Sequence, residues 1–218
     1  ISTGYKVNDA ADNAAYWSIA TTMRSDNKAL STVQDALGLG SAKVDVAYTG
    51  MNAAIKVVDE IKTKLVAARE PGVDRSKVQE EITQLQNQLV SITTAAAFSG
   101  ENWLSVDSGD AAYSATKSIV ASFNRSSAGT VSVSTVDIDI SSTELFGAAD
   151  QSGILDTTFT TTGAGAATVS VSDLDITAAG IDNTDIDDMI SNVDGALASM
   201  STAAATLGAA KSRVSIQK

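Results

Sequence analysis

The 218-residue sequence predicts an α+β protein, in which a long antiparallel helical rod carries a small inserted β-rich module. Three observations lead to this fold class. Apolar residues recur at spacings of three and four along three segments, aromatic residues make up only 5% of an alanine-rich chain, and one region alternates apolar and polar residues instead. Heptad spacing is typical of helices packed along a coiled-coil seam, and alternation is typical of strands.

The first two rod segments form a helical hairpin. A four-and-three rhythm with one slip near Ile61 predicts a helix over about 43–69, roughly 40 Å long. Its expected seam is Val44, Tyr48, Met51, Ile55, Val58, Ile61 and Leu65. Pro71, the only proline, ends that helix near 69–70, and Gly72 supplies the turn. The spacing of Ser76 and Gln79 predicts a capping box for the next helix. Its expected seam is Val78, Ile82, Leu85, Leu89, Ile92 and Ala96.

Two further helical segments flank this hairpin in the sequence. Residues 8–37 are an alanine-rich helical pattern with apolar side chains available for packing at Ile19, Met23, Leu30, Val33 and Leu37. Gly38 and Gly40 either separate this helix from the next one or weaken a continuous helix. Near the C-terminus the heptad returns at Ile190, Val193, Leu197, Met200, Ala204 and Leu207, with Lys211 at a seam position before Val214. This last helix is expected to return along the hairpin.

An internal repeat predicts two strands between the helical parts. TVSVSTVDIDI at 130–140 and TVSVSDLDITA at 168–178 match without a gap, and both alternate apolar and polar residues. Each copy slips in phase at the same place, after Val133 and after Val171, which predicts a shared bulge. TTTGAGAA at 160–167 is expected to be a loop.

Composition disfavours most enzyme classes. The chain has no cysteine and no histidine, so it lacks disulfides, thiolate nucleophiles, the usual zinc ligands and the commonest general base. We therefore expect no catalytic activity, no cofactor and no metal. The net charge is −11, and the stretch from Ser126 to Ala210 holds twelve of the 26 acidic residues and none of the 15 basic ones. Such a surface repels phosphates and anionic lipids, so neither nucleic acid nor a membrane is an expected partner.

Several residues could have a role in metal binding, catalysis or sugar binding as well as a structural one. Asp137 and Asp139, or Asp185, Asp187 and Asp188, offer oxygen ligands for calcium, but they lack the spacing of an EF-hand loop and are better interpreted as solvated or helix-capping acids. Paired carboxylates could serve a glycosidase, although chance pairs are common among so many acids. Trp17 lies in a helical pattern and is expected to pack, whereas Trp103 is the more plausible exposed aromatic for stacking on sugars.

Three long segments resemble the conserved ends of bacterial flagellin. They are VNDAADNAAYWSIATTMRSDNKAL from Val7, VAAREPGVDRSKVQEEITQLQNQLVSITTAAAFSGENWL ending at Leu104, and NVDGALASMSTAAATLGAAKSRVSIQ from Asn192. The resemblance implies a discontinuous helical rod domain over 1–104 and 185–218, with a variable β-rich outer module over 105–184. It also implies that the outermost helices of both family termini are absent.

The function implied by this resemblance is structural. Flagellin subunits are secreted and stack helically into the extracellular filament of the bacterial flagellum, with rods inside and the variable module facing solvent. Implied partners are other flagellin subunits, the flagellar cap and the hook-associated proteins. Polar positions near the start of the family's rod match Asn8, Asp12, Asn13 and Arg24, which are candidates for subunit contacts; local capping explains the first three equally well. The alternative is a cell-surface polysaccharide-binding protein that uses the inserted module to bind a glycan.

One departure from the family pattern concerns immune recognition. Many flagellins are sensed by a vertebrate Toll-like receptor through the helix before the turn, where the family typically carries an arginine and, three residues later, a glutamate. An ungapped match anchored on Ile55, Leu65 and Gly72 places Ile61 and Lys64 at these altered immune-receptor positions. The loss of one charge and the reversal of the other predict a poor ligand for that receptor.

Overall fold

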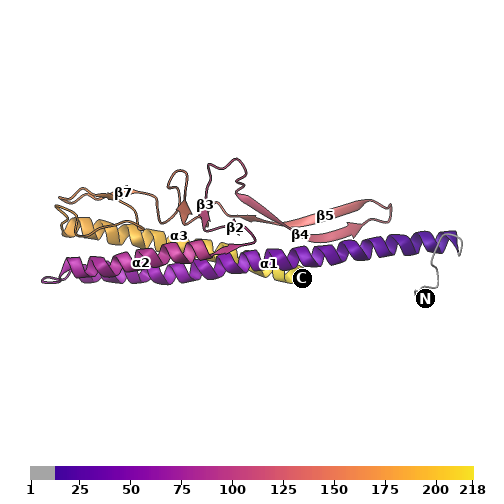
Figure 1. The fold of residues 1–218 in the computed structure, drawn as a ribbon, viewed down its shortest axis with the longest axis horizontal. Coiled ribbons are helices and arrows are strands. Elements are labelled where there is room, and N and C mark those ends of the chain that lie inside the picture. Colours follow the sequence, from indigo (N-terminus) through magenta and orange to yellow (C-terminus); the bar gives the residue numbers. More distant parts are fainter. Residues whose placement is uncertain (1–12) are drawn as a thin grey trace.

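Three long helices run side by side in a computed structural model that describes residues 13–218, with short strands and loops along one side (Figure 1). They are α1 (Ala14–Ala68), α2 (Arg75–Ala95) and α3 (Asn183–Gln217). At 55 residues α1 is about 80 Å long, and it continues through Gly38 and Gly40 without a break. The predicted hairpin with a returning C-terminal helix is therefore confirmed.

The turn between α1 and α2 differs in detail from the prediction. α1 ends at Ala68, and Gly72 adopts a positive φ of 81° in the turn that follows the exposed Pro71. The N-cap of α2 is Asp74, whose side chain accepts a hydrogen bond from the Ser76 amide. The predicted capping box is wrong, because the side chain of Gln79 binds the backbone of the inserted module instead of closing the helix start.

Ion pairs fix the direction of α3 relative to α1. Arg69 near the end of α1 pairs with Asp187 near the start of α3, whereas Lys211 near the end of α3 pairs with Asp45. The two helices are therefore antiparallel and in contact over roughly half of the length of α1. Lys64 pairs with Glu81 on α2, which lies against the same part of α1.

The buried seam is more regular than the sequence suggested, because small residues occupy it. On α1 the buried heptad is Val33, Leu37, Gly40, Val44, Ala47, Met51, Ala54, Val58, Ile61, Leu65 and Ala68, without a slip. The larger Tyr48 and Ile55, predicted as seam residues, are only half-buried beside Ala47 and Ala54. Small side chains at the seam let helix axes approach closely, and larger neighbours then cover its flanks.

On the other two helices, too, small or polar residues occupy buried seam positions where neighbouring residues were predicted. Ala196, Ala203 and Ala210 lie in the α3 seam, where Leu197, Ala204 and Lys211 were predicted. Lys211 is instead exposed, with its ammonium group 5.3 Å from the centre of the Tyr48 ring. On α2 the half-buried Leu85 and Ile92 flank a seam that includes two polar residues, Gln86 and Thr93.

The β-rich part consists of four two-stranded sheets. The strands are β1 (Ala97–Phe98), β2 (Glu101–Asn102), β3 (Ser105–Val106), β4 (Thr116–Arg125), β5 (Val131–Asp139), β6 (Phe146–Gly147), β7 (Phe159–Thr160) and β8 (Thr168–Val169). The antiparallel pair β4–β5 is the longest and extends beside α1 (Figure 1). The first repeat copy forms β5, and the predicted bulge lies on the partner strand, at Ala121 between Val120 and Ser122.

The second repeat copy is not the long strand that was predicted. Only its first two residues pair, as β8, and the segment that follows turns across α2 with Val171, Leu174 and Ile176 buried. Gln86 Nε2 donates hydrogen bonds of 3.2 Å to the carbonyl oxygens of Val171 and Leu174, and Gln79 accepts one of 2.9 Å from the Ile176 amide. These bonds to α2 replace the strand ladder. The predicted loop at 160–167 is confirmed except for Thr160, which ends β7, because residues 161–167 connect β7 to β8.

Candidate assembly surface

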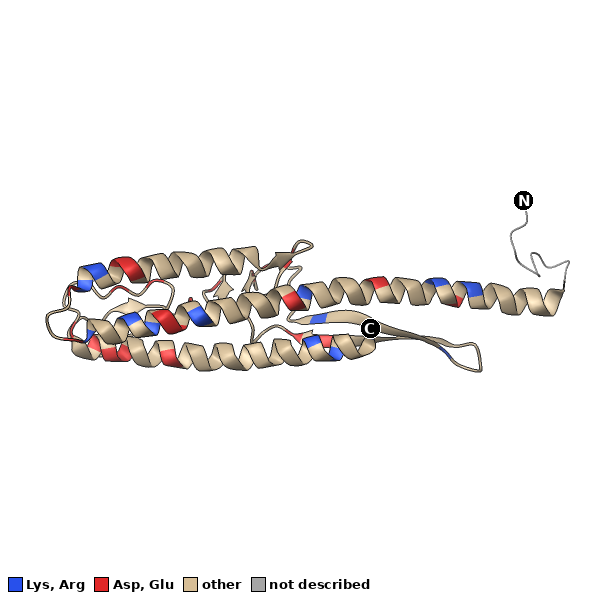
Figure 2. Cartoon of the chain, turned by 90° about the horizontal axis from the view of Figure 1, so that it is seen from below, with Lys and Arg blue, Asp and Glu red and all other residues tan. Residues whose placement is uncertain are grey.

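The heptad of α1 continues beyond the part that the rest of the molecule covers. Tyr16, Ile19, Met23 and Leu30 lie at spacings that extend the buried seam, yet their side chains are 65, 57, 66 and 45% exposed. We call these four residues the exposed stripe. In Figures 1 and 2 the first part of α1 projects past the C-terminal end of α3, which is why α3 cannot cover the stripe. An apolar row of this size on a helix marks an interaction surface.

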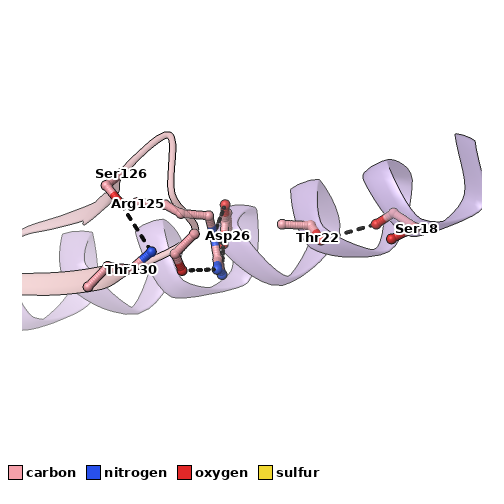
Figure 3. Close-up of polar contacts among 7 residues, drawn as sticks. Ser18, Thr22, Asp26, Arg125, Ser126 and Thr130 are labelled. Carbon is pink, nitrogen blue, oxygen red and sulfur yellow. Dashed lines mark hydrogen bonds and ion pairs between the residues drawn. The ribbon is translucent and has the colours of Figure 1, made fainter. Parts of the chain in front are cut away.

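One polar residue interrupts the exposed stripe and connects it to the module. Asp26 occupies the heptad position between Met23 and Leu30, and its carboxylate accepts hydrogen bonds of 2.8–3.1 Å from the Arg125 guanidinium at the end of β4 (Figure 3). Arg125 also donates to the Gly129 carbonyl, so it holds the hairpin turn against α1. The hydrogen bond from Arg125 lowers the pKa of Asp26 and that from Asp26 raises the pKa of Arg125. Both groups are therefore charged near neutral pH.

Charged residues lie on both the projecting and the covered parts of α1 (Figure 2), and several on the covered part pair with α3. Lys62 and Arg69 of α1 pair with Asp194 and Asp187 of α3. The acidic stretch of the sequence therefore extends from the module into the first turns of α3, where two of its carboxylates are neutralised by α1. This pairing leaves the rod without a strong charge of one sign, which favours close packing of several copies.

Two of the four predicted contact residues, Asn13 and Arg24, lie near the start of α1. Asn13 is the N-cap of α1, where its side-chain oxygen accepts from the amides of Ala15 and Tyr16. Arg24 lies half-buried on α1 next to the exposed stripe. The other two candidates, Asn8 and Asp12, fall outside the described residues.

The altered immune-receptor positions differ in exposure. Ile61 is fully buried in the seam, whereas Lys64 is half-buried at the surface and forms a 2.6 Å ion pair with Glu81. The hydrogen bond to Glu81 raises the pKa of Lys64. Ile61 lies about 55 Å along α1 from Arg24, so these two residues form no common site.

The expected exposed aromatic is not exposed. Trp103 is 3% exposed and belongs to the core, and its indole N–H donates a hydrogen bond of 3.4 Å to a Glu101 carboxylate oxygen. Trp17 is half-buried on α1. Within residues 13–218, no group of three or more acidic, histidine or cysteine side chains is arranged to hold a metal ion.

Three aspartates that were not predicted to act together hold the loop of the module on the rod. The carboxylates of Asp182, Asp185 and Asp188 accept hydrogen bonds of 3.1, 2.9 and 2.7 Å from the amides of Ala164, Gly165 and Thr162. We call this the aspartate clasp. Asp182 and Asp185 also form a reciprocal capping box at the start of α3, which confirms the helix-capping interpretation of Asp185. The only sequence signal was a spacing of three residues at a helix start.

Hydrogen bonds stabilise the ionised forms of two clasp residues, Asp185 and Asp188. The Thr161 hydroxyl, followed by the amides of Asp182 and Gly165, holds the pKa of the buried Asp185 carboxyl well below its ordinary value of 3.8. The Thr162 hydroxyl and amide likewise lower the pKa of Asp188. Asp185 and Asp188 are therefore ionised at neutral pH, and the clasp fastens the module to the end of the rod.

Comparison with known proteins places this architecture in a family. The sequence model of the bacterial flagellin N-terminal helical region matches residues 1–108, which include α1, α2 and β1–β3. Flagellin C of Rhizobium meliloti (strain 1021) is 49% identical over 234 residues, which cover all of this chain and 72% of that protein. The chain belongs to the bacterial flagellin family.

Other flagellins match over different shares of their length. Flagellin A of Rhizobium meliloti (strain 1021) is 62% identical over 157 residues, covering 72% of this chain and 39% of that protein. A flagellin of Brucella melitensis biotype 1 is 40% identical over 219 residues, covering all of this chain and 68% of that protein. This flagellin chain thus spans about two fifths of the length of flagellin A. No helix within residues 13–218 has the length and apolar character needed to cross a membrane.

Proposed function

We propose that this flagellin is a structural subunit of the bacterial flagellar filament, which assembles by helical stacking of its rods. The exposed stripe carries the proposal. Four large apolar side chains continue a seam that is buried elsewhere on α1. Covering them would be favourable, because removing apolar surface from water stabilises contacts by about 25 cal/mol per Å². In the filament the stripe would be covered by helical segments of flagellin, so that a rod poorly covered in isolation becomes fully packed.

The proposal assigns different positions to the two parts of the chain. Residues 1–104 and 185–218 form the helical rod domain inside the filament, and residues 105–184 form the outer module that faces solvent. The module carries ten acidic residues but only Lys117 and Arg125 as basic ones, which keeps the filament soluble. The subunit would act outside the cell, with other flagellin subunits, the flagellar cap and the hook-associated proteins as partners.

The polysaccharide-binding alternative gains no support from the module. Its expected aromatic platform, Trp103, is buried, and the Asp137 carboxylate accepts hydrogen bonds from the Ser118 and Thr135 hydroxyls of the β4–β5 pair. A sugar site needs exposed aromatic surface or convergent polar groups in a hollow. We therefore retain only the structural role.

We also propose weak recognition by the Toll-like receptor, because Lys64 lies at the surface of the rod and Ile61 lies in its buried seam. A receptor that approaches the folded rod would meet Lys64 and its partner Glu81, but not Ile61, which faces the seam. Lys64 carries the opposite charge to the glutamate of the family pattern. We expect this reversal to weaken binding, because like charges across an interface repel.

The filament proposal is tested by placing a charge on the exposed stripe. Met23→Lys in the complete flagellin, expressed in cells without another flagellin, should abolish or strongly shorten filaments, because an ammonium group would be buried in the assembled seam. Thr21→Lys adds the same charge at an exposed position off the stripe and is the matched control. Electron microscopy measures filament length, and secretion of both variants is checked in the medium. Normal filaments from Met23→Lys would contradict the proposal.

A further inference from the structure

The β4–β5 pair is a two-stranded sheet, so within residues 13–218 the outer edge of β5 has no partner strand. Val131 to Thr135 are all exposed on this strand, and Val131 and Val133 are 46 and 56% exposed. An unpaired edge presents backbone donors and acceptors to another chain. Native proteins usually protect such an edge with a charge, a proline or a covering loop, and none of these lies over Val131–Thr135 in the described part of the chain.

Hydrogen bonds at the two ends of β5 show which backbone groups face outward. The Thr130 carbonyl accepts a hydrogen bond from the Ser126 amide, and the Ile140 amide donates one to the Ala115 carbonyl, so Thr130 and Ile140 face β4. The Asp137 carbonyl faces the other way and accepts from Arg213 of α3. Backbone groups alternate along an antiparallel strand. Val131, Val133 and Thr135 therefore turn their N–H and C=O groups away from β4, and α3 limits the free edge at Asp137.

The charge pattern favours a second copy of this chain at that edge. From Ser126 to Val136 there is no charged residue and no proline, although residues 105–184 hold ten acids and two bases. Two modules that approach each other elsewhere would meet carboxylates of the same sign, whereas two copies of this stretch would not repel. The alternating valine and serine residues of one copy can also pair antiparallel with the same residues of a second copy. This arrangement has twofold symmetry, which is the commonest symmetry of dimers.

We propose that the outer edge of β5 at Val131–Thr135 is a self-association surface, at which two outer modules join edge to edge into a four-stranded antiparallel sheet. The pairing goes beyond the filament proposal and does not depend on it. A twofold contact cannot repeat between subunits that all point the same way, so it would join subunits of separate filaments or free subunits.

The test uses the 218-residue chain in solution. Sedimentation equilibrium up to about 1 mM should show a monomer–dimer equilibrium. Val133→Pro removes one outward N–H and leaves the ladder to β4 intact, since edge strands tolerate proline. It should raise the dimer dissociation constant about tenfold or more, because symmetry removes the donor twice. Val133→Thr keeps the N–H, is the matched control and should change the constant less than about threefold.

Hydrogen exchange gives a second measurement that does not require a variant. At high concentration the amides of Val131, Val133 and Thr135 should gain protection, whereas those of Ser132 and Ser134, which face β4, should not change. A chain that stays monomeric while the outward amides exchange freely overturns the proposal. It is equally overturned by a dimer that survives Val133→Pro and disappears with Met23→Lys, since the exposed stripe would then be the contact.

Discussion

The two parts of α1 carry the same heptad but have different surroundings. From Val33 to Ala68 the seam faces α2, α3 and the β4–β5 pair, and its residues are buried. From Tyr16 to Leu30 the same spacing continues, and the side chains are exposed because α3 ends before it reaches them. A heptad thus specifies which face of a helix is suited to a partner. The arrangement of the other helices decides whether that partner lies in the same chain. The filament proposal assigns the uncovered part of α1 to contacts with other subunits.

The largest expected difference between the two parts comes from a buried charge. Ile61→Arg should destabilise the chain by about 3–5 kcal/mol, because an unpaired guanidinium would lie in the dry seam. Ile19→Arg, which puts the same side chain on the exposed stripe, should change the free energy of unfolding by less than about 0.5 kcal/mol. Urea unfolding followed by circular dichroism measures both, and similar losses would refute the assigned seam. The arginine that the family pattern carries at this position would therefore destabilise this chain.

A matched pair of leucines makes the comparison without adding charge. Leu65 is fully buried and Leu30 is 45% exposed on the same helix. Leu65→Ala should cost about 2–5 kcal/mol, since it removes packed methyl groups and leaves a cavity. Leu30→Ala should cost less than about 1 kcal/mol, as expected for a surface substitution. If thermal or urea unfolding gave equal costs, the stripe would already be covered in the isolated chain.

Acid should affect the end of the rod that carries the aspartate clasp. The pKa of Asp185 is lowered in the folded chain, so its contribution to stability is present above the ordinary value of 3.8 and is lost as pH falls below it. The melting temperature should therefore drop below about pH 4. Asp185→Asn, which cannot ionise, should melt lower at pH 7 and show a shallower acid dependence. An unchanged acid slope in this variant would assign the effect to other carboxylates.

The sequence predicted the helices better than the details of their contacts. Heptad spacing identified three long helices and the proline turn, because periodic burial is a property of the whole segment. It misassigned individual seam positions wherever a large residue lay beside a small one, as with Ile55 beside Ala54 and Leu197 beside Ala196. A larger apolar side chain has a stronger preference for burial, but its size does not show how closely the two helix axes approach.

The module could be predicted less well, since its structure depends on contacts distant in sequence. Two nearly identical copies of one pattern become a long strand and a turn, and the difference is made by β4 for one copy and by Gln79 and Gln86 for the other. Trp103 was expected outside and is inside for the same reason. The aspartate clasp was equally hidden, because its acceptors and donors lie about 20 residues apart.

Hydrogen exchange along α1 in the isolated 218-residue chain tests the account most directly. Amides from Val44 to Ala68 should exchange only with global unfolding, whereas those before Val33 should exchange far faster, because a helix without tertiary packing opens locally. The boundary should lie near Val33 and Leu37, the first buried seam residues. Uniform strong protection from Tyr16 to Ala68 would contradict the account, since the exposed stripe would then need no further partner.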